Sequence, residues 1–226
     1  NSNGWLSGFD PETGLVNGDA IVARHAKYAD GIGHEEHQYY FGAQNFQCRG
    51  DTDVAQERPN ERFPDPAFAS EFGFLGLPSF DSFARYSSPP DWALSAPLVQ
   101  HSIDKIAGGT IGSGIEFMFA DAALAQSSEA AFRRTTYLSQ LLQAQCLSAE
   151  AAHYRRGRTF SPLQNASAGT MGVMFWMFNS PYPSGDWATV DVDGRWRMAQ
   201  YEMAQVYSPL LLSAVAVPLA PPPPPP

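Results

Sequence analysis

The sequence is short of positive charge and of long apolar runs. Of its 226 residues, 14 are Lys or Arg and 23 are Asp or Glu, which gives a formal net charge of −9. Because nucleic-acid binders need clustered Lys and Arg against the phosphate backbone, this balance argues against a nucleic-acid partner. No apolar run reaches the roughly 18 residues that a transmembrane helix requires, so no membrane partner is expected. An acidic, aromatic-rich chain instead suits a neutral substrate such as a sugar.

Cysteine is equally scarce. Cys48 and Cys146 do not have the spacing of a metal-ligand set, and two cysteines this far apart in sequence cannot be assigned to a disulfide without geometry. We expect both to be free thiols. The chain also begins at Asn1 without Met or a charged-then-apolar leader, so we expect it to be a fragment of a longer protein.

What the sequence does contain is a succession of short apolar segments and helical patterns. Strands are predicted at 35–41, 67–74 and 172–179, and helices at 20–28, 129–156 and 196–207. A turn at Asp193-Gly194 precedes the last helix. In the long helix, three- and four-residue spacing predicts one buried face, made of Leu138, Leu141, Leu142, Gln145, Ala149 and Ala152. The order strand, strand, helix, strand, helix predicts an α/β fold that fits the closing third of a β/α barrel.

One acidic residue stands out within the second predicted strand. The segment reads Ala69-Ser70-Glu71-Phe72-Gly73. A buried parallel strand is almost continuously apolar, so a carboxylate near its C-terminal end is poorly placed for packing and well placed for chemistry. Glu71 is therefore the leading candidate for a catalytic group.

Many stretches, in order along residues 33 to 212, resemble the β-mannosidases of glycoside hydrolase family 2. They include Phe68 to Phe74, Asp91-Trp92, Thr136 to Gln140, Gly169 to Gly172, Phe175-Trp176, Gly194 to Met198 and Ser208 to Leu211. The resemblance implies a partial (β/α)8 TIM-type barrel, with residues 1–212 as the C-terminal part of the catalytic barrel. Residues 213–226, which end in six prolines, are expected to be a disordered proline-rich tail.

The resemblance also implies a retaining β-mannosidase that removes terminal, non-reducing β-D-mannose through a glycosyl-enzyme intermediate. Glu71 matches the family's nucleophile. Its acid/base is a Glu in an Asn-Glu pair on an earlier strand, whereas Asn60-Glu61 here lies in a polar, proline-flanked loop. We interpret Glu61 as a surface acid and expect the proton donor to lie before Asn1.

Four further residues are candidates for binding the sugar. The family places a Trp on the floor of its mannose pocket at the position of Trp176, and aromatic faces stack on the apolar faces of sugars. Asn179 follows in the same segment, although Ser180-Pro181-Tyr182 departs from the family's pattern there. His37 and Tyr39 match a family strand beside the nucleophile, where a Tyr can keep the carboxylate ionised.

Other features carry less weight. His34 and His37 beside two glutamates do not predict a metal site, because a strand sends residues three apart to opposite faces, and no cofactor is expected. His101 is interpreted as a loop or cap residue, and Trp92, Trp187 and Trp196 as packing. The sequon Asn165-Ala166-Ser167 favours a lysosomal, vacuolar or secreted location.

Three functions stay open on the sequence. The first is a β-mannosidase fragment that acts on β-mannoside oligosaccharides. The second is an inactive sugar-binding or structural remnant, in which open sheet edges pair with the missing N-terminal part of the barrel. The third is another β-glycosidase of the same family, of the β-galactosidase or β-glucuronidase type, because one hydroxyl configuration is a small change in a pocket.

Overall fold

The structure is a computed structural model that describes residues 35–39, 68–102, 110–119, 128–157, 170 and 172–213. The predicted helix at 20–28, Asn60-Glu61, His34, the sequon at Asn165 and the proline tail from residue 214 lie outside these residues. The division into residues 1–212 and a tail therefore stays a prediction.

A sheet of parallel strands forms the centre of the described chain. It contains β1 (Glu35–Tyr39), β2 (Phe68–Gly73) and β3 (Gly172–Phe175), in the order β1-β2-β3. The three predicted strands are confirmed; β2 and β3 end earlier than predicted, and residues 40 and 41 of the first predicted strand lie outside the described residues. For β3 the cause is visible, since Met177 donates its N–H to Trp187 O at 3.1 Å instead of continuing the ladder.

A bulge interrupts β2 one residue before Glu71. Ala69 pairs with Glu36 in β1, but the next pair joins Glu71 to His37, which leaves Ser70 as an extra residue. The ladder with β3 is irregular over the same stretch. As a result Ala69 and Phe72, three positions apart, are both buried in the same apolar core.

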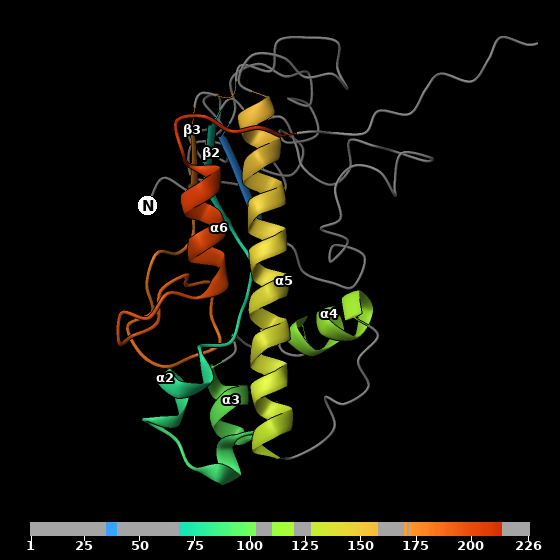
Figure 1. Cartoon of the computed structure of the whole chain (residues 1–226), viewed down its shortest axis with the longest axis vertical. Helices are drawn as coiled ribbons and strands as arrows, with labels where there is room; N and C mark the ends of the chain where they lie inside the picture. The colour runs from blue at the N-terminus through green and yellow to red at the C-terminus, as the bar shows by residue number, and fades with distance from the viewer. Residues whose placement is uncertain are drawn as a thin grey trace, which may run out of the picture.

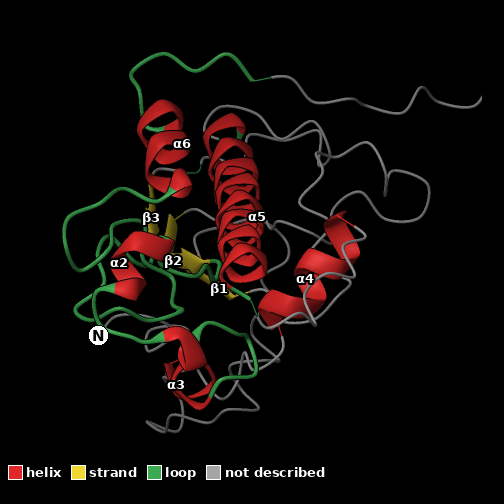
Figure 2. Cartoon of the chain, turned by 60° about the horizontal axis from the view of Figure 1, so that its bottom comes forward, coloured by secondary structure: helices red, strands yellow, loops and turns green. Residues whose placement is uncertain are grey.

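Two helices cover one face of the sheet. The long helix α5 (Glu129–Arg156) and the short helix α6 (Met198–Val206) lie side by side in front of the strands (Figures 1 and 2). They pack on Ala69, Phe72, Val173 and Phe175 from β2 and β3. This arrangement, helix over parallel strands, confirms the α/β class.

The ends of these helices follow from their sequences. The Ser128 side chain caps α5 by accepting the Ala131 N–H at 3.2 Å, so the predicted range 129–156 is confirmed. Two arginines in its last turn bind the chain that leaves α6: Arg155 donates to Val206 O and Ser208 O, and Arg156 to Ser213 Oγ. The last helix begins two residues later than predicted because the backbone of Arg197 is still extended.

Of the predicted face of α5, only Leu142 is fully buried. Gln145 is exposed, and Leu138, Leu141, Ala149 and Ala152 are only half buried. The buried side of the helix mixes apolar and polar residues: Phe132, Thr135, Thr136, Ser139, Gln140, Leu142, Gln143, Cys146, Leu147, Glu150, Ala151, His153 and Tyr154. Periodicity of apolar residues misses this face because many of its members are polar groups that hydrogen-bond inside the protein.

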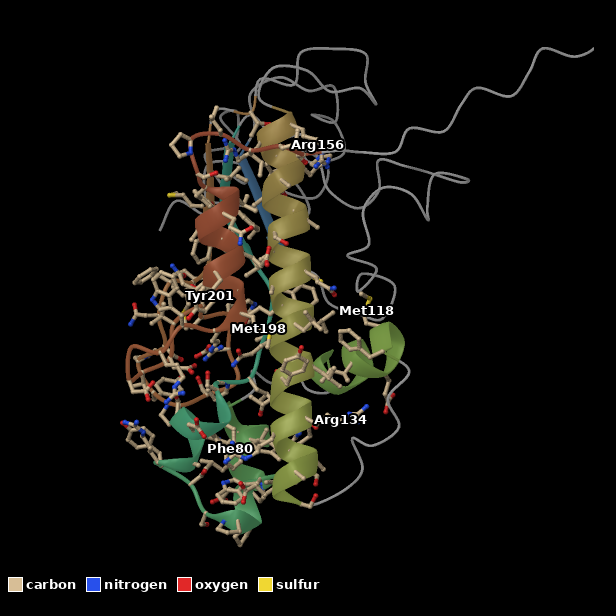
Figure 3. All side chains as sticks on the ribbon, viewed as in Figure 1. Phe80, Met118, Arg134, Arg156, Met198 and Tyr201 are labelled. Carbon is tan, nitrogen blue, oxygen red and sulfur yellow. The ribbon has the colours of Figure 1, made fainter. Side chains whose placement is uncertain are left out.

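Shorter helices lie beyond the C-terminal ends of the strands. They are α2 (Phe80–Ala84), the 3-10 helix η2 (Pro89–Asp91), α3 (Pro97–Ser102) and α4 (Thr110–Phe119). A second apolar core joins α2, α3 and α4 to the first turns of α5 through Phe80, Phe83, Val99, Ile115 and Phe132. Figure 3 shows Phe80 on α2 near the start of α5, and Met118 on α4 beside the same helix.

Two further expectations are tested by the structure. Cys146 is disulfide-bonded, so the expectation of a free thiol is wrong at this position; the chain's other cysteine, Cys48, lies outside the described residues. Within the part of the chain that the structure describes, no helix is long and apolar enough to cross a membrane.

Candidate active site at the strand ends

The backbone brings three of the predicted site positions to neighbouring strands. In the central strand β2, Glu71 pairs with His37 of β1, and Gly73 pairs with Tyr39. Because parallel strands point their C-terminal ends to the same edge, all three positions lie at or near one end of the sheet. Only the backbone of Glu71, His37 and Tyr39 is described, so their roles stay predictions.

Trp176 reaches the same edge from the other side of β2. It follows β3 directly, and its N–H donates to Phe72 O at 2.7 Å, next to Glu71 in the chain. The Trp176–Met177 peptide bond is cis. The indole is 47% exposed and Met174, two residues earlier, is 51% exposed, whereas Val173 and Phe175 pack under the helices. Trp176 therefore lies on the face of the sheet opposite α5 and α6, accessible to a ligand.

Asn179 lies farther along the segment that follows β3. It forms an isolated parallel bridge with Val190 and is exposed. Its neighbours are fixed, since Val190 N–H donates to Phe178 O and Ser180 N–H donates to Val190 O, both at 2.9 Å. Asn179 thus occupies a defined loop position past the strand, and not the strand end that the sequence predicted.

A buried ionic cluster braces this loop, and sequence reasoning missed it. Arg197 is fully buried, and its guanidinium contacts Asp191 at 2.7 Å and Asp186 at 2.9 Å. Nothing in the apolar pattern marks these residues, because they come from a segment without regular secondary structure. The usable signal was the presence of three aspartates and two arginines between residues 186 and 197.

The remaining candidates lie away from the sheet edge. His101 is exposed in the last turn of α3, rather than in a loop. Trp92 packs edge-on against Phe80 with ring centroids 4.9 Å apart, and Trp187 packs on the second core, so the packing interpretation is confirmed for both. It is wrong for Trp196, which is 46% exposed and contacts Tyr201 edge-on. Among the described residues, no group of three or more His, Cys, Asp or Glu could hold a metal ion.

Comparison with known sequences shows which class of protein this chain is similar to. No protein-family model matches the chain. It is 33% identical to a β-mannosidase of Bos taurus over 152 residues, which covers 66% of this chain and 17% of that protein. It is 27% identical to β-mannosidase A of Aspergillus clavatus over 166 residues, covering 67% of this chain and 17% of that protein. By sequence the chain is thus related to glycoside hydrolases.

The structural comparison agrees. A β-D-mannosidase from Dictyoglomus thermophilum superposes with a TM-score of 0.51 at 16% sequence identity, over 78% of this chain and 19% of that one. At that identity the likeness concerns the fold alone. The sequence relatives confirm the resemblance that the motifs indicated: the chain is similar to β-mannosidases. It spans about a sixth of the length of the relatives that it matches.

Proposed function

We propose that this chain carries the nucleophile half of a retaining β-mannosidase site, built on the closing third of a β/α barrel. The observation that supports it most is the position of Glu71 on the central strand, one residue from the carbonyl that binds the Trp176 amide. A carboxylate carried by the strand next to an accessible indole, at the C-terminal edge of a parallel sheet, is suited to attack a sugar that stacks on that indole. The identity to β-mannosidases favours mannose over other β-linked sugars.

The chemistry that follows uses two carboxyl groups. Glu71 attacks the anomeric carbon while the bond to the leaving oxygen breaks, and a second carboxylic acid protonates that oxygen. The resulting carboxylate then takes a proton from water, the hydroxide attacks the anomeric carbon, and Glu71 is released as a carboxylate. In retaining enzymes the two groups lie roughly 5 to 5.5 Å apart. We propose that the proton donor belongs to an earlier strand of the barrel.

In this proposal the other predicted residues surround the sugar ring. Trp176 forms the floor, Asn179 hydrogen-bonds hydroxyls, and Tyr39 with His37 holds the nucleophile ionised. The proposed substrate is a β-mannoside oligosaccharide, and the proposed context is glycoprotein breakdown in a lysosomal, vacuolar or secreted setting. No cofactor takes part.

A second candidate is a remnant that binds sugar, or another part of the barrel, without cleavage. It is favoured by the exposure of Met174 and Trp176, because parallel sheets are normally covered on both faces. In that case upstream barrel strands would cover this face, with or without a complete catalytic pair.

The proposal is tested with Glu71→Gln. We expect hydrolysis of an aryl β-mannoside to fall at least about 1000-fold, because the amide cannot attack, while folding is kept. The assay compares the chain itself with an upstream-extended chain, and an aryl β-glucoside reports sugar preference. Glu116→Gln, an exposed acid on α4, is the matched control and should leave the rate unchanged.

Each outcome separates the candidates. Normal hydrolysis by Glu71→Gln would remove Glu71 as nucleophile. Mannoside binding without hydrolysis in either chain favours the remnant, and a preference for the β-glucoside favours another β-glycosidase.

A further inference from the structure

We propose that Arg197 is a positioning residue: through Asp186 and Asp191 it fixes the segment after β3 against the segment after β2, and so sets where Trp176 lies relative to the Glu71 strand. The guanidinium is fully buried and uses each of its nitrogens. Nε donates to Asp191 Oδ1 at 2.7 Å, and Nη2 donates to Ser184 O at 3.3 Å. Nη1 donates to Gly76 O at 3.1 Å and pairs with Asp186 Oδ1 at 2.9 Å.

The two carboxylates extend this network into both segments. Asp191 Oδ2 accepts the N–H of Ser79, which follows β2, at 2.9 Å. Asp186 Oδ2 accepts the hydroxyls of Ser180 and Ser184, and its Oδ1 accepts the N–H of Ala188 at 3.0 Å. Gly76 and Asp186 also exchange backbone hydrogen bonds of 2.9 and 3.1 Å. The Arg197 guanidinium and the Asp191 carboxylate are therefore bound by groups of both segments, through Gly76 O and the Ser79 N–H, whereas the Asp186 carboxylate is bound within the segment after β3.

A short chain of backbone contacts links Arg197 to Trp176. The Arg197 N–H donates to Thr189 O at 2.9 Å, and the Thr189 N–H donates to Met177 O at 3.1 Å. Met177 is the residue after Trp176, whose own N–H binds Phe72 O. The backbone at Trp176 and Met177 is thus held at two points, one on β2 and one on the segment that the ionic cluster fixes.

The charged composition of the cluster indicates that its role is to fix the positions of the two segments more than to stabilise the fold. Two carboxylates share one guanidinium, which leaves a net negative charge inside the protein, and an apolar replacement of similar volume would often be as stable. The planar guanidinium carries five N–H donors in a fixed arrangement, so it can bind several acceptors in defined directions at once. Lysine keeps the charge but cannot reach Asp191, Asp186, Gly76 O and Ser184 O together.

Hydrogen exchange in the full chain tests the brace without any sugar. Arg197→Gln should speed amide exchange in peptides covering 74–79 and 176–191 by roughly 100-fold or more, because breaking a buried pair leaves its partners uncompensated. Arg197→Lys should give a smaller increase in the same peptides, while peptides from 138–150 in α5 stay protected. Arg195→Gln is the matched control, since Arg195 lies two residues away and is 41% exposed in its pair with Asp81.

If Arg197→Gln does not fold, Arg197→Lys decides. Uniform loss of protection including α5 in Arg197→Lys, or unchanged exchange at 74–79 and 176–191, overturns the proposal. Selective loss in those two segments supports it.

The link to catalysis rests on the proposed function and has its own measurement. With an aryl β-mannoside and the chain form found to be active, Arg197→Lys should raise KM about tenfold with a smaller change in kcat, whereas Arg195→Gln should change neither. Selective exchange without any mannoside hydrolysis in the unmodified protein would support the brace and remove the proposed function. Hydrolysis that is indifferent to Arg197→Lys would keep the function and remove the positioning role.

Discussion

The helix-covered face of the sheet and the segments that follow β2 and β3 are held by different kinds of interaction. Beneath the strands, α5 and α6 pack on an apolar core that includes Phe72, Leu147 and Met203. Beyond the strand ends, the segments that carry the candidate site are tied by buried polar groups, among them Arg197 and Gln143. Apolar packing tolerates small shifts, while directional bonds fix positions, so the molecule uses the second kind where placement matters.

The largest expected effect on stability comes from the apolar core between the sheet and its two covering helices. Phe72 is fully buried and meets Tyr154 of α5 edge-on, with ring centroids 5.5 Å apart. Phe72→Ala should lower the free energy of unfolding by about 3–5 kcal/mol, measured by urea denaturation. The exposed change Gln145→Ala on α5 should stay within about 0.5 kcal/mol. Equal effects of the two would mean that this core does not stabilise the fold.

An intermediate effect on stability is expected where the helix-covered face meets the segments that follow the strands. A side chain at Gly76 would overlap the amide of Gln143, which donates to Phe74 O at 2.9 Å and to Ala188 O at 3.1 Å. Gly76→Ala should therefore cost about 1–3 kcal/mol of unfolding free energy. In the Gly76→Ala/Gln143→Ala double variant the two costs should not add, because one substitution relieves the other's overlap. Strict additivity in this cycle would contradict the close contact.

The smallest effect concerns the turn before α6. Burial raises the pKa of Asp193, but the hydrogen bond from Ser82 Oγ and the nearby Arg85 and Arg195 outweigh it, so the pKa lies below its ordinary value. The stabilisation is therefore present above the unfolded-state pKa of about 3.9 and is lost as pH falls below it.

Asp193→Asn should reduce the free energy of unfolding by at most about 1 kcal/mol at pH 7. The gap from the unmodified protein should shrink below roughly pH 4 in thermal unfolding followed across pH. A gap that widens in acid would reverse the sign argued here.

The contrast between these two regions also explains which features the sequence could predict. The strands β2 and β3 were predictable as short apolar runs, and α5 was predictable as a long helical segment whose ends Ser128 and Gly157 mark. The motif around Glu71 indicated the resemblance to β-mannosidases. The buried face of α5 was not predictable, because Ser139 and Gln143 are polar and bind groups that lie between 45 and 69 positions away in the sequence. The buried position of Arg197 was not predictable for the same reason, because long-range polar contacts produce no periodic pattern in the sequence.

The extra residue in β2 has a practical consequence. Successive side chains of a strand point to alternate faces of the sheet, and the extra residue Ser70 shifts this alternation by one position just before Glu71. Anyone who transplants this strand, or aligns a distant homologue to it, must count that residue: removing it would turn either Ala69 or Phe72 out of the core and present a different set of side chains to the opposite side. One unpaired serine thus decides which residues of the motif can meet a substrate.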